Sequence, residues 1–84
     1  MKIMKYRYVL RWFDKTKAEV GSVPLSIPRE ELRQLFHLDP DDPVVDSYPV
    51  TCMSQALEIE ESIGNWIDEN QFDYFVECEP ISRK

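Results

Sequence analysis

The fold is decided by residues 4–13, which have the sequence MKYRYVLRWF. Every second residue in this stretch is large and apolar, and basic residues occupy most of the positions between. The apolar set is Met4, Tyr6, Tyr8, Leu10 and Trp12, and the opposite set is Lys5, Arg7, Val9, Arg11 and Phe13. An alternation with period two, rich in aromatic and branched side chains, is typical of a strand with one buried face.

Two further strands are expected beside this one. Residues 14–17 are polar and turn-like, so residues 19–25 predict the return strand of a hairpin. Pro24 places that strand at a sheet edge, because proline donates no ladder hydrogen bond. Residues 72–79 alternate again, with Phe72, Tyr74, Val76 and Cys78 inward and Asp73, Phe75, Glu77 and Glu79 outward. Opposite charges on neighbouring strands contribute a few tenths to about 1 kcal/mol per pair. The outward acids complement Lys5, Arg7 and Arg11, which predicts the sheet order second–first–last.

Two helices are expected between the second strand and the last. Pro28 suits the first position of a helix, and Glu30 and Glu31 would lie in its first turn, where acids favour the helix dipole. Residues 39–43 contain two prolines and end this helix. Residues 44–50 are ambiguous, because they are apolar enough to pack but contain a proline that argues against a central strand.

The second helix is expected to start near Thr51 or Ser54, since both are suitable N-caps. Its spacing places one set of side chains toward the core, namely Ala56, Ile59, Ile63 and Trp66. The opposite face consists of Gln55, Glu58, Ser62, Asn65 and Glu69. Gly64 ends or kinks this helix before Trp66.

These elements predict one α+β domain over residues 1–84, with an ordered core of about 4–79 and the order β-β-α-α-β. A small antiparallel sheet would carry both helices on one face. A chain of 84 residues forms one thin core and has little room for a buried active site.

Charge is divided unevenly along the chain. Residues 1–38 carry eight basic and four acidic side chains, whereas residues 39–84 carry twelve acidic side chains and, as basic ones, only Arg83 and Lys84. The net charge of −6 repels phosphate backbones and argues against a nucleic-acid ligand. Two interpretations stay open at this point, a solvated acidic face and a surface that attracts a basic partner.

The sequence offers no motif for catalysis or for metal binding. His37 lacks an accompanying nucleophile motif, and Pro43 with no following glycine spoils a calcium loop at residues 39–42. The two cysteines, Cys52 and Cys78, make no disulfide framework and fit a reducing cytosol. No stretch approaches the roughly 20 apolar residues of a membrane helix. We therefore expect a cytoplasmic protein that is not an enzyme, with no cofactor, no metal and no membrane contact.

Several short stretches resemble a family of short uncharacterised bacterial proteins. They are Phe13-Asp14-Lys15, Gly21-Ser22-Val23-Pro24-Leu25, Leu32-Arg33-Gln34-Leu35-Phe36, Asp41-Asp42-Pro43, Tyr48-Pro49-Val50 and Tyr74-Phe75-Val76-Glu77-Cys78. Some members of that family resemble immunity proteins of polymorphic toxin systems, including contact-dependent growth inhibition. The resemblance implies a non-catalytic immunity protein whose partner is a cognate toxin with a basic surface, such as a nuclease.

A binding role requires charged residues that attract the partner and apolar residues that anchor it. The acids expected to contact the partner are Asp41, Asp42, Asp46, Glu58, Glu61, Asp68 and Glu69, and the aromatic anchors expected to be exposed are Tyr48, Trp66 and Phe75. Two alternatives belong to other classes of protein. One is a protein-interaction or homo-oligomeric module unrelated to toxins, including a homodimer, and the other is a small enzyme that uses Cys52 or Cys78.

Overall fold

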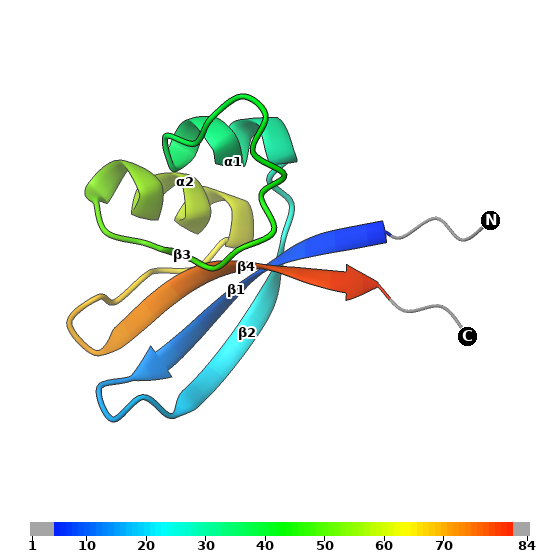
Figure 1. Cartoon of the computed structure of the whole chain (residues 1–84). Coiled ribbons are helices and arrows are strands. Elements are labelled where there is room, and N and C mark those ends of the chain that lie inside the picture. The colour runs from blue at the N-terminus through cyan, green and yellow to red at the C-terminus, as the bar shows by residue number, and fades with distance from the viewer. Residues whose placement is uncertain (1–4, 82–84) are drawn as a thin grey trace.

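A four-stranded antiparallel sheet carries two helices on one of its faces in the computed structural model (Figure 1). The structure describes residues 5–81. The elements are β1 (Lys5–Asp14), β2 (Glu19–Leu25), α1 (Arg29–Leu35), β3 (Tyr48–Pro49), α2 (Met53–Ile63) and β4 (Phe72–Ile81). The α+β fold and the β-β-α-α-β order are confirmed, with the two-residue β3 added between the helices. The expected inward position of Met4 and the outward position of the Lys5 side chain lie outside what the structure describes.

The sheet has the order β2-β1-β4-β3, so the last strand lies beside the first, as charge complementarity predicted. The register pairs Leu10 with Val23 of β2 and with Val76 of β4. Residues of one parity therefore line up across three strands on the face that the helices cover. The other face of the sheet has no helix over it (Figure 1).

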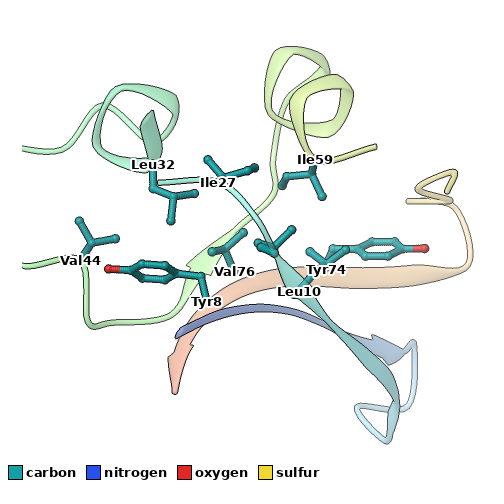
Figure 2. Packing of buried hydrophobic residues seen from close by; sticks show 9 residues of the cluster. Tyr8, Leu10, Ile27, Leu32, Val44, Ile59, Tyr74 and Val76 are labelled. Atoms are coloured by element: carbon teal, nitrogen blue, oxygen red, sulfur yellow. The ribbon is translucent and has the colours of Figure 1, made fainter. Parts of the chain in front are cut away.

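The core lies between the covered face of the sheet and the helices. Figure 2 shows side chains from both layers meeting there, with Leu10 and Val76 rising from the sheet toward Leu32 of α1 and Ile59 of α2. These four residues and Val44 of the α1–β3 connection are fully buried. Burying a large aliphatic side chain contributes about 1.5–3 kcal/mol, so this cluster attaches the helices to the sheet.

Both outer strands of the sheet contain an exposed proline. Pro24 lies in β2, as its sequence position predicted, and Pro49 lies in β3, which pairs with β4 only through Tyr48 and Pro49. Residues 44–50, which the sequence left ambiguous, thus contribute a minimal edge strand. Within residues 5–81, no helix combines the length and the apolar character needed to cross a membrane.

The helix ends follow the sequence signals in part. Gly64 ends α2 in the left-handed conformation (φ 68°), as expected. Pro28 is the residue before α1 rather than its first residue. Helix α2 begins at Met53, between Thr51 and Ser54 and so near the expected start, but its N-cap is neither of them: Cys52 occupies that position and makes no capping hydrogen bond with its side chain.

Gln55 was wrongly assigned to the solvent face of α2. Its side chain is buried, with Oε1 accepting a hydrogen bond from the Thr51 backbone N–H (2.8 Å) and Nε2 donating to the Leu35 carbonyl (3.3 Å). This glutamine thus satisfies a backbone donor just before the N-cap residue Cys52. The same side chain ties the start of α2 to the end of α1.

Candidate protein-binding surface

The face of the sheet without helices carries a network of ion pairs. We call it the open sheet face and define it by Arg7, Val9, Arg11 and Phe13 of β1 and by Asp73, Phe75, Glu77 and Glu79 of β4. Arg7 pairs with Glu79 (2.6 Å), and Lys15 of the β1–β2 turn pairs with Asp73 (3.0 Å). These contacts confirm that the outward acids of the last strand meet the outward bases of the first.

Arg11 is the centre of this network. Its guanidinium contacts Glu77, Glu79 (3.1 Å) and Glu19 of β2 (3.7 Å). Val9 beside it is only 4% exposed although no helix covers this face. The long side chains of the open sheet face therefore cover part of its own apolar surface, as arginine stems commonly do.

Neighbouring bases shift two carboxyl groups of this face. The hydrogen bond from Lys15 lowers the pKa of Asp73, and the hydrogen bond from Arg7 lowers the pKa of Glu79. Both groups are held as carboxylates by partners within the same chain. The acids of the open sheet face are thus largely neutralised internally.

The helical layer, formed by α1 and α2, contains a groove of about 700 Å³ between the two helices. We call it the acidic groove, and it is lined by Ile27, Glu31, Gln34, Leu35, Ser54, Leu57, Glu58 and Glu61. The first four residues come from α1 and the segment before it, and the other four come from one stripe of α2. Figure 1 shows the two helices lying side by side above the sheet.

The acids of this groove have no basic partner. Among the described residues, one ion pair lies outside the sheet and its β1–β2 turn, between Arg33 and Glu30 of α1. None involves Glu31, Glu58 or Glu61. Three carboxylates therefore border one groove without an ion pair to any residue of the described range 5–81. Such a site attracts a cationic partner and repels an anionic one.

The charges of α2 oppose its own dipole. The helix has no acid in its first turn and no base in its last turn, where Glu60 and Glu61 lie instead. Acids near a helix C-terminus are unfavourable, typically by about 0.3–1 kcal/mol each. Helix α1 shows the favourable arrangement, with Glu30 and Glu31 in its first turn and Arg33 in its last. The helix dipole therefore disfavours both acids of the last turn, although the Glu60 carboxylate accepts a hydrogen bond from the Ile67 backbone N–H just after the helix (2.8 Å).

Large apolar side chains are exposed beside the groove. Trp66 is 86% exposed, Met53 68% and Leu57 56%, and Met53 and Leu57 lie one turn apart on α2. Trp66 borders a second hollow of about 360 Å³ that shares Leu57 and Glu61 with the acidic groove. The two hollows therefore adjoin each other along α2. An exposed aromatic residue next to a groove with apolar lining residues is typical of a protein-binding surface.

Trp66 was wrongly included in the core stripe of α2. Because Gly64 ends the helix, the 3–4 spacing no longer applies two residues later, and the indole projects away from the core. The alternative expectation of an exposed aromatic fits this residue. The structure brings Trp66 together with Glu58 and Glu61, so three of the expected partner-binding residues lie on one continuous surface.

The expected residues of the α1–β3 connection lie elsewhere. Asp41 and Asp46 are exposed and do not line the groove. Asp42 has an internal role, since its Oδ1 accepts hydrogen bonds from the Val44 N–H (2.8 Å) and from the Tyr48 hydroxyl (3.3 Å). Val44 has a left-handed backbone (φ 55°) that is strained for a branched residue, and Asp42 helps to hold it.

Tyr48 and Phe75 are not the exposed anchors that were expected. Tyr48 is half-buried and packs on Phe36 with ring centroids 5.6 Å apart, and burial raises the pKa of its hydroxyl. Phe75 packs edge-on against Phe13 on the open sheet face (5.7 Å). Both rings are held by neighbours in the same chain.

Asp68 and Glu69 belong to the α2–β4 connection. Asp68 is half-buried, and its backbone N–H donates to the Tyr74 hydroxyl (3.1 Å) while its Oδ1 accepts from the Asn70 N–H (3.2 Å). Glu69 is exposed and its carbonyl accepts a hydrogen bond from Lys15 Nζ (3.3 Å). The structure therefore gives Asp68 a turn-forming role and separates both residues from the acidic groove.

Leu57, Met53 and Glu31 belong to the surface but were not identified from the sequence. A signal was present, because Met53 and Leu57 are four residues apart and lie outside the core stripe of α2. An apolar pair on the otherwise polar side of a helix indicates a second contact surface. Glu31 could not be found in this way, since its place in the groove depends on how α1 lies against α2.

The two cysteines differ in environment. Burial raises the pKa of the Cys78 thiol, which faces the core, whereas a hydrogen bond with Ser54 lowers the pKa of the exposed Cys52 thiol. Within the described residues, the Ser54 hydroxyl (3.3 Å) is the hydrogen-bond partner that the structure gives the Cys52 sulfur. His37 is exposed just after α1, in a left-handed conformation. Residues 5–81 contain no group of three or more His, Cys, Asp or Glu placed to hold a metal ion.

These features define a small α+β domain with a charge-paired sheet face and an acidic groove whose three carboxylates form no ion pair with the described residues. The chain belongs to the family of domains of unknown function called DUF7683, whose model matches residues 7–77. The match runs from β1 into β4 and so contains both helices and the acidic groove. No curated protein and no solved structure matches the chain. The resemblance to immunity proteins stays a prediction.

Proposed function

We propose that this protein is a non-catalytic immunity protein that binds and neutralises a basic toxin through its helical layer. The observation that carries the proposal is the acidic groove, where Glu31, Glu58 and Glu61 form no ion pair with residues 5–81 and Leu57 and Trp66 are exposed beside them. Unpaired charge accelerates association with a cationic protein, and a desolvated aromatic anchor slows its dissociation.

The charge arrangement of α2 supports a binding role over a merely solvated face. Solubility needs net charge but does not require acids in the last turn of a helix, where they reduce stability. Sites that sacrifice stability are commonly functional. A basic partner would supply the missing compensation for Glu61, and binding would therefore stabilise α2.

The toxin is the partner that the family resemblance implies, and we place the activity in the cytoplasm. Both described cysteines are free thiols, which suits a reducing compartment. A nuclease fits the chemistry, because an acidic protein can occupy a cationic cleft that otherwise holds phosphates.

Co-expression with the product of the adjacent gene tests the proposal. We expect a 1:1 complex, protection from killing, and an affinity that falls as the salt concentration rises. Trp66→Ala should weaken binding by about 2 kcal/mol or more while leaving the fold intact, as expected for an exposed anchor. A neighbour that neither binds this chain nor harms the cell would refute the toxin assignment.

Two further experiments separate the competing classes. Sedimentation at micromolar concentration distinguishes a free monomer from a homo-oligomer that uses Trp66 as its own interface. The variant Cys52→Ser keeps full protection if the protein is non-catalytic, whereas an enzyme that depends on this thiol loses its activity.

A further inference from the structure

We propose that the acidic groove receives one amphipathic α-helix of the partner, with an apolar stripe flanked by lysine or arginine. This inference rests on the proposed function, because it names the part of the partner that the helical layer binds. It commits to a helix rather than to an extended peptide, a second copy of this chain or a nucleic acid.

The spacing of the groove residues favours a helix. On α2 the groove stripe runs through Ser54, Leu57 or Glu58, and Glu61, which are steps of three and four residues. These positions form a ridge with about 5.4 Å between turns, which matches the turns of a second helix packed along it. An extended peptide places side chains on one face only every second residue, about 6.6 Å apart, and does not keep this spacing.

The lining of the groove combines apolar and acidic side chains. Ile27 and Leu35 contribute apolar surface from the α1 side and Leu57 from α2, and the adjoining hollow adds Trp66. Helices bound in grooves use apolar anchors at positions i, i+3 or i+4, and i+7. A partner helix of about three turns spans the eleven residues of α2.

Charge complementarity predicts that the residues flanking the apolar stripe of the partner helix are basic. Glu31 borders the groove on α1, and Glu58 and Glu61 border it on α2. Basic side chains on both flanks of the partner helix would meet these carboxylates while the apolar stripe enters between them. An equally amphipathic helix with acidic instead of basic flanks would be repelled by these carboxylates and would not bind.

The other occupants fit less well. A second copy docked symmetrically would bring identical acids face to face. The basic side chains that a second copy offers from β1 and the β1–β2 turn are already paired on the open sheet face, such as Arg7 with Glu79. A nucleic acid carries the same charge as the groove.

Titration of the intact, isotope-labelled chain with designed peptides tests the inference. One peptide of about 18 residues, long enough to form a helix when bound, has leucines at helical spacing and lysines elsewhere. The control peptide has the same composition with leucines at every second position. We expect the helical peptide to shift the amide resonances of Leu57, Glu58 and Glu61 and to bind at least about tenfold more tightly than the control.

Matched variants show whether the groove or the overall charge is responsible. Glu58→Gln with Glu61→Gln should weaken binding of the helical peptide about tenfold or more. Asp41→Asn with Asp46→Asn removes the same charge from an exposed segment outside the groove and should change the affinity less than about threefold.

Three outcomes overturn the inference: equal binding of both peptides, resonance shifts confined to the open sheet face, or no binding of the helical peptide. If the toxin nevertheless binds the helical layer, the proposed function stands and only the helical occupant is wrong. If the helical peptide enters the groove but the adjacent gene product does not bind, the toxin assignment fails on its own.

Discussion

The open sheet face and the helical layer both carry acidic side chains, but these differ in whether a basic side chain lies beside them. On the open sheet face, Asp73 and Glu79 are paired with lysine and arginine from β1 and its turn, and these contacts lower their pKa values. On the helical layer, Glu58 and Glu61 have no basic neighbour among the described residues. The sheet therefore uses its charges for the fold, whereas Glu58 and Glu61 form no ion pair with any described residue.

The difference corrects the simplest interpretation of the sequence. The acidic second half of the chain is one block in sequence but two surfaces in space. Its β4 acids are neutralised by the basic first half, whereas the acids of α2 are not. When a long acidic segment is used to predict a binding surface, the acids that form ion pairs across the sheet must therefore be left out of the count.

The largest effect is expected at the contact between the two regions. Ile59→Ala should reduce the free energy of unfolding by about 2–5 kcal/mol, because the fully buried side chain attaches α2 to the sheet. Urea unfolding followed by circular dichroism and by tryptophan fluorescence should give coincident transitions. Leu57→Ala on the same helix is the control and should change stability by less than about 0.5 kcal/mol. Loss of helical signal before the sheet unfolds would contradict one cooperative core.

Arg11→Met tests the paired side of the comparison. It should lower stability by about 1–2 kcal/mol, because Glu19, Glu77 and Glu79 would lose their shared partner while the apolar stem is kept. Added salt should reduce the loss. Lys17→Met removes the well-exposed ion pair between Lys17 Nζ and Asp73 Oδ2 (3.7 Å) and should have no measurable effect on stability. Equal losses for both variants would show that the network has no centre.

Glu61→Gln tests the helical layer, and its effect on stability should be opposite in sign to that of Arg11→Met. Removing an acid from the last turn of α2 should raise stability by about 0.3–1 kcal/mol. Glu31→Gln, in the first turn of α1, should lower stability by a similar amount. Both variants should weaken binding of the partner, since both residues line the groove. Thermal unfolding and partner titration measure the two effects, and parallel shifts in stability would refute the dipole argument.

The pH dependence of stability should report the open sheet face. The folded-state pKa values of Asp73 and Glu79 are lowered, so the unfolded chain binds protons more readily as the pH falls. Stability from these groups is fully present above about pH 5 and is lost progressively below about pH 4. Glu79→Gln should make urea midpoints between pH 5 and pH 2 less steeply dependent on pH. An unchanged slope would show that these pairs do not favour the folded state.

Much of the fold followed from local patterns. The alternation in β1 and β4 identified the buried face of the sheet, and the facing charges of Arg11 and Glu77 correctly set the two strands side by side. Pro24 marked an outer strand, and Gly64 marked a helix end. Each of these signals acts within a strand, a turn or a pair of neighbouring strands.

The groove could not be predicted in the same way. It depends on the placement of α1 against α2, two helices joined by a long segment that carries no periodic pattern. Gln55 and Trp66 show why the helix pattern misled: buried glutamine is satisfied by backbone partners on α1 and before α2, and Trp66 follows the helix end. Their positions depend on tertiary contacts rather than on spacing.

The prolines in β2 and β3 have a consequence for how copies of this molecule meet. Pro24 and Pro49 each remove a backbone donor from an outer strand and so interrupt the ladder that a neighbouring chain could extend at those two positions. Addition of a strand along β2 or β3 is therefore disfavoured. The molecule can therefore expose Leu57 and Trp66 for recognition with a reduced risk that its strands aggregate.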